Sequence, residues 1–367
     1  MKTEATGTAG TTTTPSTRID AIDNLRVMLT VLVVAHHAAI TYSHIPMWYY
    51  TEPAQDLTGL PLDIFVVSNQ AFFMGFFFLI SGFFTPGSYD RKGARPFLRD
   101  RLVRLGIPLL AYVLLLRPLA DLGGYLRQDA LPFWQYYLRS WDPGPMWFVE
   151  VLIVLAAAYA GWRALRPPLD ARPAPPRPRW IVLFVLGLAV ATFVWRVPVP
   201  TGSYWPVAGL PTPDYLPQYV SMFVLGCVAH RRGWFGTLPA RAALAGFGAA
   251  GVATAALMPV AYGGSGPLAQ AAICLWQSVF AVGMIIGFTV WFRERWNRQG
   301  PRGRFLSRHA YTVYIVHPLV LVGLGWALSP LAAPAVVKFA IMLVLALPLC
   351  WGLAFLVRRL PGAGRVL

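Results

Sequence analysis

Ten long apolar runs, separated by short polar segments, dominate the sequence from Leu25 onward. Their limits are 25–42, 62–84, 105–120, 145–163, 180–197, 215–230, 242–260, 269–292, 310–328 and 333–357. A helix needs about 20 mainly apolar residues to cross the hydrocarbon core of a bilayer. The pattern therefore predicts an all-α, polytopic membrane protein with about ten transmembrane helices. The third run is short and contains Arg117 and two prolines, so its assignment depends on the charges of the loops.

The composition excludes a soluble enzyme with a large core. Residues of the AVILMFWYC class make up 56% of the 367 residues and charged residues only 13%, against about 45–50% and 25% in soluble domains. Residues 1–17 are mostly Thr, Ala and Gly, which predicts a disordered tail and not a secretory signal. Residues 18–360 are expected to form a single ten-span membrane domain, and residues 361–367 a short cytoplasmic tail.

The formal net charge of +16 bears on the orientation of the protein in the membrane. In a soluble protein it would suggest nucleic acid, but in a membrane protein it is typical of cytoplasmic loops, which face anionic lipids. Six segments on the same side of the ten-run pattern carry 26 of the 31 lysines and arginines: the tail to Arg26, 91–104, 163–179, 231–241, 293–308 and the C-terminus from Arg358. We therefore expect both termini in the cytoplasm, a plasma-membrane location, membrane lipids as neighbours and no nucleic-acid partner.

One of the runs carries a pattern that concerns helix packing. Ala242, Gly246, Ala250 and Thr254 repeat at intervals of four residues. Small side chains at this spacing allow two membrane helices to approach closely. We expect this stripe to lie against another helix.

Ionisable side chains inside a span are costly and therefore mark candidate functional sites. In the first run, Arg26 and His37 are 11 residues apart, which places them on one helix face about 16 Å apart along the axis. His36 projects about 100° away from that face. His37 thus has two interpretations, a proton-transferring imidazole on the face of Arg26 or a buried, hydrogen-bonded packing residue.

Arg101 and Arg104 lie three residues apart at the basic start of the third run. In an α-helix this spacing puts both guanidinium groups on one side. Guanidinium forks match the geometry of phosphate groups, so the pair suits a ligand that carries several phosphates. The alternative is ordinary basic charge at the membrane surface, with lipid headgroups as partners.

Two further residues stay open between structural and accessory roles. Glu150, near the start of the fourth run, either orients a base or forms an ion pair with Arg117 or Arg139. His317 precedes Pro318, and it either takes part in the chemistry or bonds the carbonyl that the proline leaves free. No metal site is expected, because the histidines lack metal-ligand spacing and accompanying carboxylates.

Several of these motifs occur together in a known family. Arg26 with His37, the pair Arg101 and Arg104, and the tracts 77–82, 145–148 and 307–318 resemble the membrane acyltransferase-3 family, most of all the branch that succinylates periplasmic glucans. The resemblance implies transfer of an acetyl- or succinyl-class group from cytoplasmic acyl-CoA to a hydroxyl of an extracytoplasmic glycan or other surface acceptor. It also implies that His37 is the base or acyl carrier, that Arg26 is its companion, and that the arginine pair binds CoA.

Two other classes of function remain as alternatives. A proton-coupled transporter would use the intramembrane residues His37, His317 and Glu150 to relay protons, although no internal repeat of the transporter kind is visible. A lipid-binding scaffold subunit would account for the basic loops but would give the shared face of Arg26 and His37 no purpose. The glutamate that many family members carry lies further along the fourth span than Glu150, so its role is not transferred.

Overall fold

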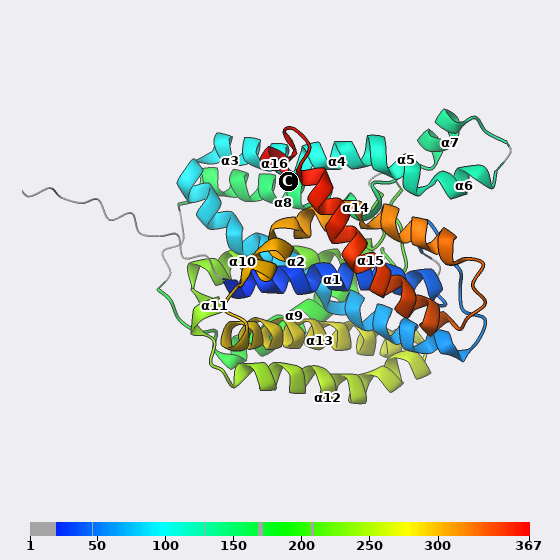
Figure 1. The fold of residues 1–367 in the computed structure, drawn as a ribbon. Coiled ribbons are helices and arrows are strands. Elements are labelled where there is room, and N and C mark those ends of the chain that lie inside the picture. The colour runs from blue at the N-terminus through cyan, green and yellow to red at the C-terminus, as the bar shows by residue number, and fades with distance from the viewer. Residues whose placement is uncertain (1–19, 46, 129, 168–171, 207–208) are drawn as a thin grey trace, which may run out of the picture.

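The computed structural model of the chain describes residues 20–367 apart from 46, 129, 168–171 and 207–208 (Figure 1). The predicted tail, residues 1–17, lies outside the described residues. The described part is helical and contains no strand. In chain order its elements are α1 (Asp20–Tyr42), η1 (Leu57–Gly59), α2 (Leu60–Lys92), α3 (Ala94–Arg101), η2 (Leu102–Gly106), α4 (Ile107–Ala111), η3 (Tyr112–Leu116), α5 (Arg117–Ala120), α6 (Leu122–Leu126), α7 (Phe133–Arg139), η4 (Gly144–Met146), α8 (Trp147–Leu165), α9 (Pro178–Trp195), η5 (Pro213–Tyr215), α10 (Leu216–Arg231), α11 (Trp234–Thr237), α12 (Ala242–Gly263), α13 (Gly266–Arg295), α14 (Pro301–Leu328), α15 (Ala335–Arg358) and α16 (Ala363–Val366).

The all-α, membrane-spanning class is confirmed. Each of the ten predicted runs coincides with helix, and nine helical segments among the described residues are long and apolar enough to cross a membrane. The remaining run is α10, which has 16 residues and is therefore about 24 Å long. This is shorter than the hydrocarbon core of about 30 Å.

The third span is interrupted where its prolines lie. Two π-helical turns, η2 and η3, precede Pro108 and Pro118 along the segment 94–120. A proline has no N–H to donate and its ring collides with the carbonyl four residues earlier, so the backbone widens by one residue per turn. This widening frees backbone carbonyls in a helix that otherwise crosses as one segment.

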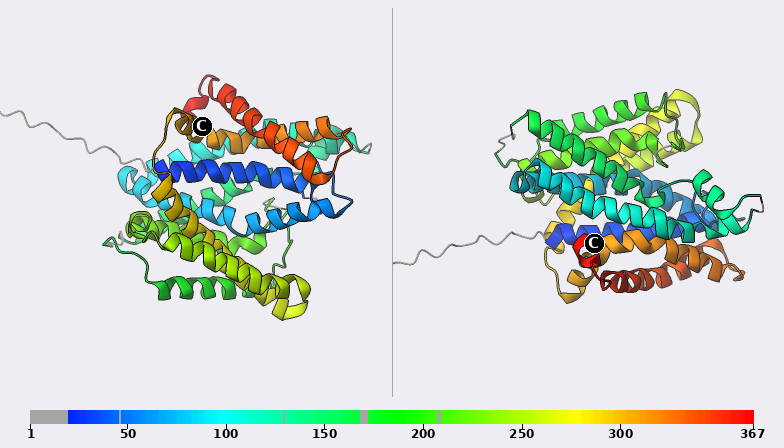
Figure 2. Two further views of the ribbon diagram at one scale, coloured as in Figure 1. Left: turned by 60° about the horizontal axis from the view of Figure 1, so that its bottom comes forward. Right: turned by 90° about the horizontal axis from the view of Figure 1, so that it is seen from above.

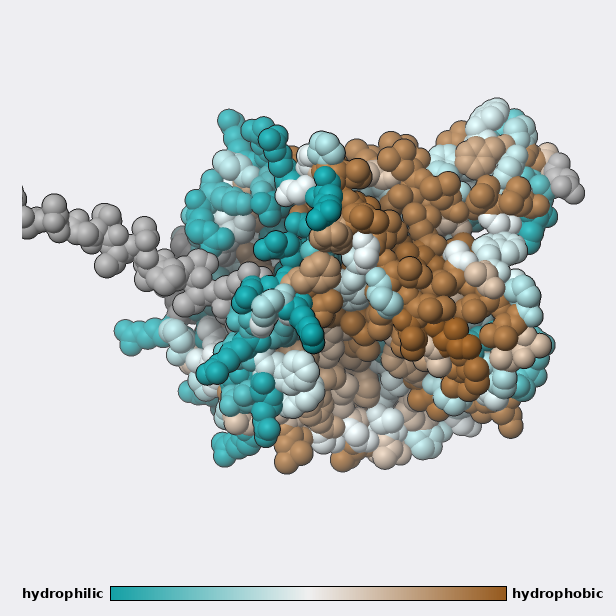
Figure 3. Space-filling model, in the orientation of Figure 1, coloured by the Kyte–Doolittle hydropathy of each residue, from teal (hydrophilic) through white to brown (hydrophobic). Residues whose placement is uncertain are grey.

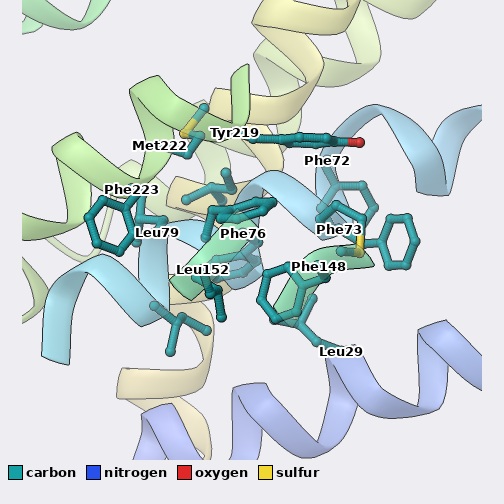
Figure 4. Packing of buried hydrophobic residues seen from close by; sticks show 14 of the residues in the cluster. Leu29, Phe72, Phe73, Phe76, Leu79, Phe148, Leu152, Tyr219, Met222 and Phe223 are labelled. Carbon is teal, nitrogen blue, oxygen red and sulfur yellow. The ribbon is translucent and has the colours of Figure 1, made fainter. Parts of the chain in front are cut away.

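The long helices lie roughly along one axis and form three layers (Figure 2). α14 and α15 lie on one side, α1 and α2 lie in the middle, and α9, α12 and α13 lie on the other side. α1 packs against α2, α13, α14 and α15, which makes it the central helix of this arrangement. The aromatic core between α2, α8 and α10 includes Phe76, Phe148 and Tyr219 (Figure 4).

The segments that carry the basic residues meet at one end of the bundle, which we call the basic end. There Asp90 of α2 pairs with Arg163 of α8 and Arg231 of α10, and Asn24 of α1 bonds the carbonyl of Trp296 after α13. Figure 3 shows hydrophilic side chains gathered at this end and a broad hydrophobic band beside them. The side of the membrane that this end faces stays a prediction.

Two pairs of helices approach closely through glycine. A methyl group added to Gly226 of α10 would overlap the carbonyl of Leu79 in α2, so the two backbones are in contact. In α12, Gly246 faces Gly283 of α13 in the same way, and Thr254 accepts a hydrogen bond of 3.0 Å from the Trp276 indole. The predicted small-residue stripe of α12 is therefore a helix contact.

The last residues are also folded. Ala363–Val366 form the short helix α16, which packs against η2, and the side chain of Leu367 packs against the core. Residues 361–367, which were expected to form a short tail, thus lie beside η2, the turn that follows Arg101.

Candidate functional site

Two histidines from distant parts of the sequence meet between α1 and α14. His37 Nδ1 lies 3.2 Å from His317 Nε2 although 280 residues separate them in the chain. Their ring centroids are 4.9 Å apart. The contact joins the residue proposed as base or acyl carrier with one whose role the sequence left open.

Pro318 determines how these two rings are protonated. It cannot donate to the carbonyl of Tyr314, and His317 Nδ1 bonds that carbonyl at 2.7 Å. A carbonyl only accepts, so His317 carries its proton on Nδ1 and its Nε2 is an acceptor. His37 Nδ1 lies 2.9 Å from the carbonyl of Val33 and therefore also carries a proton, which it shares with His317 Nε2. The free lone pair of the neutral His37 is consequently on Nε2.

The surroundings of His37 leave it accessible. His36 and His317 are buried, whereas His37 keeps partial exposure. The Trp48 indole packs against the His37 ring with centroids 4.0 Å apart and an interplanar angle of 31°, and it is nearly parallel to the His317 ring at 6.0 Å. Trp48 therefore covers the histidine pair from the loop that connects α1 with α2.

The loop that carries Trp48 is held at several points at the end opposite the basic end. The backbone N–H of His44 donates to Asp63 at 2.9 Å, and the His44 ring bonds the same carboxylate at 2.7 Å. This hydrogen bond raises the pKa of His44 above its ordinary value of 6.5. Glu52 forms an ion pair with Lys338 of α15. The loop is thus tied both to α2 and to α15.

His36 lies on a different face of α1, as the helical arithmetic predicts. Its ring is buried against Phe73 of α2, with centroids 4.9 Å apart, and is perpendicular to the His37 ring. Its Nδ1 is shielded and has no hydrogen-bond partner among the described residues. His36 therefore contributes packing next to His37 and has no direct path to the exposed side of the pair.

Arg26 lies at the basic end of α1, about three helical turns from His37. Its side chain is 40% exposed and pairs with Asp23 at 3.5 Å. α1 is uninterrupted between the two residues, so the predicted shared face is retained. No direct contact joins Arg26 and His37, and a molecule that touches both must extend along α1.

Arg101 and Arg104 differ in environment because the turn between them is π-helical. Arg101 lies over the ring of Phe97 at 5.3 Å, and its Nε is shielded and without a partner in the described part of the chain. The Arg104 side chain is 64% exposed, with Nε 3.0 Å from Asp100. The turn between the two arginines is thus π-helical and not the regular α-helix that their spacing suggested.

An aromatic row on α14 connects the arginine turn with the histidine pair. Tyr311, Tyr314 and His317 follow at intervals of three residues, and the two tyrosine rings are nearly parallel with centroids 6.3 Å apart. The Tyr311 hydroxyl donates to the carbonyl of Arg104 at 3.1 Å, a carbonyl that Pro108 leaves free. This row spans about 9 Å along the helix and lies between the two candidate sites.

Glu150 occupies the first turn of α8 and is half-buried. Among the described residues no ion pair or hydrogen bond involves it. The expected ion pair of Glu150 with Arg117 or Arg139 is not present there: Arg117 is buried against Ser140 and lies 3.5 Å from Asp142. Asp142 lies in the loop that precedes α8, and it is this carboxylate, not that of Glu150, that pairs with Arg117.

A polar cluster next to Trp48 was not found by sequence reasoning. The Tyr49 hydroxyl donates to Asp142 at 3.1 Å and accepts from Tyr112 at 3.3 Å. Burial raises the pKa of Tyr49, which keeps its hydroxyl protonated as a donor. Gly144 has φ of +51°, donates its N–H to Asp142 at 2.5 Å, and has no room for a side chain beside Tyr49. The signal in the sequence is the Asp-Pro-Gly-Pro turn that precedes the fourth span.

The described residues contain no group of three His, Cys, Asp or Glu side chains arranged to hold a metal ion. The side chains described at this site offer an imidazole lone pair, arginine guanidinium groups, tyrosine hydroxyl groups and the Asp142 carboxylate.

Comparison with known proteins relates the chain to one family. A family model described as an acyltransferase domain, Acyl_transf_3, matches residues 19–355. Glucans biosynthesis protein C from Salmonella typhi and from Salmonella typhimurium is 27% identical over 155 residues, which is 40% of this chain and 39% of each relative. The match thus spans well under half the length of these curated relatives. No solved structure matches the chain significantly.

Proposed function

Because the chain belongs to the acyltransferase-3 family, we propose that it moves an acetyl- or succinyl-class acyl group from cytoplasmic acyl-CoA to a hydroxyl of an extracytoplasmic glycan or other surface acceptor. The observation that carries the proposal is the orientation of His37: its Nδ1 bonds Val33 and His317, whereas its Nε2 has no hydrogen-bond partner among the described residues. An acyl thioester is already activated, so the protein has to position it and to handle one proton.

His37 Nε2 takes the proton of the acceptor hydroxyl in this mechanism. The acceptor oxygen attacks the thioester carbonyl, the C–O bond forms, the C–S bond breaks, and the CoA thiolate receives the proton from His37. The positive charge that His37 carries in between is stabilised by His317 Nε2, which accepts from His37 Nδ1. The face of Trp48 over the ring adds a favourable cation–π interaction. The same nitrogen serves equally as the nucleophile in a route through an acyl-histidine.

The donor is proposed to enter from the basic end. Its phosphates meet the guanidinium groups of Arg101 and Arg104, with Arg26 of α1 as a further cation. The narrow acyl-bearing arm then lies along the Tyr311 and Tyr314 row toward His37. In this way the polar nucleotide stays outside the hydrocarbon region and only the arm enters it.

The acceptor is proposed to approach from the opposite end, where Trp48 and the cluster of Tyr49 and Asp142 border the histidine pair. An aromatic face beside fixed hydroxyl and carboxylate groups suits a hydroxyl-rich molecule, whose C–H faces and O–H groups both find partners. With the basic end in the cytoplasm of a plasma-membrane protein, this acceptor lies outside the cell.

The deciding experiment measures CoA thiol release by the purified full chain with acetyl-CoA and with succinyl-CoA. We expect His37→Gln to reduce the rate by at least about 10²-fold, the lower limit for loss of general acid–base catalysis. His36→Gln is the matched control, because it changes a neighbouring buried histidine that lacks the contact with His317. An active His37→Gln protein would contradict the assignment of the base.

The same assay separates the enzyme from a proton-coupled transporter. A transporter would use the His37 and His317 pair as a proton relay and would release no thiol from any acyl-CoA. Thiol release that depends on His37 supports transfer. Absence of release with every acyl-CoA, together with substrate-driven proton flux in vesicles, would favour the transporter.

A further inference from the structure

An apolar pocket that the acyl-transfer site does not use lies between α9, α10 and α13 near the basic end. Its volume is about 100 Å³, and its walls include Leu79, Phe184, Met222, Leu225, Val282 and Ile285. Figure 4 shows Leu79 and Met222 on the core side, packed among aromatic rings. Trp180, Trp234 and Thr289 are the lining residues whose side chains have a polar atom, and the other lining side chains are apolar.

The pocket faces the lipid-exposed side of the bundle. Trp180 on its rim is 58% exposed, and the next residues of α9, Val182 and Leu183, are exposed as well. In a membrane this face borders hydrocarbon and not water. An apolar cavity open to hydrocarbon gains van der Waals contacts when an acyl chain fills it, and it offers water too few polar partners.

Polar groups are concentrated where the pocket meets the basic end. The guanidinium of Arg179 lies 5.6 Å from the centroid of the Trp180 ring, directly at the rim. The indole Nε1 of Trp234 is shielded and has no hydrogen-bond partner among the described residues, and the same holds for the Thr237 hydroxyl. Arg293 donates a hydrogen bond of 3.1 Å to the carbonyl of Phe235, which lines the pocket.

These groups describe the chemistry of the occupant. The Arg179 cation at the rim favours an anionic headgroup, and a phosphate matches the fork of its guanidinium N–H groups. We propose that the pocket holds a short stretch of one acyl tail of an anionic phospholipid whose phosphate lies against Arg179.

The test is native mass spectrometry of the full chain in detergent, titrated with phosphatidylglycerol or with phosphatidylcholine of the same acyl chains. We expect one phosphatidylglycerol to bind about fivefold more tightly than phosphatidylcholine, the effect of one basic residue near an anionic headgroup. Arg179→Gln should remove this preference. Arg166→Gln, another exposed arginine of the same loop region, should retain it.

A second pair of variants tests the tail. Leu225→Trp fills the pocket and should reduce binding of both lipids at least about tenfold, whereas Val190→Trp on the exposed face of α9 should leave it unchanged. Thermal unfolding without lipid reports whether each variant is folded. If Leu225→Trp does not fold, the Arg179→Gln variant still decides the test, because Arg179 is exposed and its replacement does not disturb the core.

Three outcomes would overturn the proposal: equal affinity for the two lipids, tight phosphatidylglycerol binding by a folded Leu225→Trp protein, or displacement of the lipid by stoichiometric long-chain acyl-CoA. The last result would assign the pocket to a donor chain. The binding measurement itself uses no acyl donor, so it stands or falls separately from the proposed acyl transfer.

Discussion

At the scale of single residues, a proline on α14 determines which ring nitrogen of a histidine on α1 carries the proton. Pro318 frees the carbonyl of Tyr314, the carbonyl fixes the proton of His317, and His317 then accepts from His37. At each step the hydrogen-bond direction is fixed, because a carbonyl can only accept and a neutral imidazole has one acceptor nitrogen. We therefore propose that His317 is a positioning residue, a role in which its structural and accessory interpretations are compatible.

Replacing His317 by Phe should lower kcat and leave the KM for acyl-CoA unchanged. The variant removes the acceptor that stabilises charged His37, a charge-assisted hydrogen bond worth about 1.5–3 kcal/mol, or about 10- to 100-fold in rate. His309→Phe is a matched control on the same helix, since His309 bonds the carbonyl of Phe305 at 2.7 Å but does not face His37. Equal losses of kcat in both variants would reduce His317 to a packing residue.

Replacing Arg101 or Arg104 by Ala should weaken acyl-CoA binding by about 1.5–3 kcal/mol, the range for a hydrogen bond to a charged group. Lysine should restore only part of the affinity, because it keeps the charge but loses the planar fork. Isothermal titration with a non-hydrolysable acyl-CoA analogue measures this, with Arg99→Ala as the exposed control nearby. Unchanged affinity in the double Ala variant would leave the pair as lipid-facing surface charge.

At the scale of elements, the shortest of the membrane helices depends on a neighbour. α10 cannot cross the hydrocarbon core by its length alone, and it lies in backbone contact with α2 through Gly82 and Gly226. Such contact is possible only where a side chain is absent. The same α2 surface carries Leu79, which lines the apolar pocket, so the position of α10 also sets the shape of that pocket.

Gly226→Leu should therefore destabilise the protein by about 1–3 kcal/mol, the usual range for overpacking a close contact. Thermal unfolding in detergent measures the change. Gly187→Leu on α9 is the control, because no atom lies within 4 Å of the added position there. A Gly226→Leu protein as stable as the control would show that the two helices can separate without loss.

At the scale of the whole molecule, the charges divide the bundle into two ends with different chemistry. The basic end brings together the arginine turn, Arg26 and the proposed lipid headgroup position, while the opposite end carries Trp48, Tyr49 and Asp142. The histidine pair lies between them. The proposed reaction, which joins a phosphate-bearing donor to a hydroxyl acceptor across a membrane, requires this separation.

Cysteine labelling tests the proposed orientation. In a cysteine-free background, Gln55→Cys at the opposite end should react with an impermeant maleimide on intact cells, and Arg95→Cys at the basic end should react only after permeabilisation. Both positions are exposed, so access is set by the membrane and not by burial. The reverse pattern would place the basic end outside, against the distribution expected from the positive-inside rule.

The sequence by itself determined the features that repeat along one helix. Ten apolar runs gave the helical membrane class, and the spacing of Arg26, His36 and His37 gave their faces, because backbone hydrogen bonding fixes the helical period locally. The stripe on α12 and the carbonyl freed by Pro318 were readable for the same reason. The prolines of the third span were visible too, but the π-helical turn at Arg104 was not predicted from them.

Only the tertiary structure decided which helices meet. The partner of His37 is 280 residues away, Arg117 pairs with Asp142 and not with Glu150, and Tyr311 covers the Arg104 carbonyl. Every run in this chain is similarly apolar, so hydrophobicity specifies that each one is buried in the membrane and not which neighbour it packs against. That choice depends on the combined fit of side chains over the whole bundle, which no single run encodes.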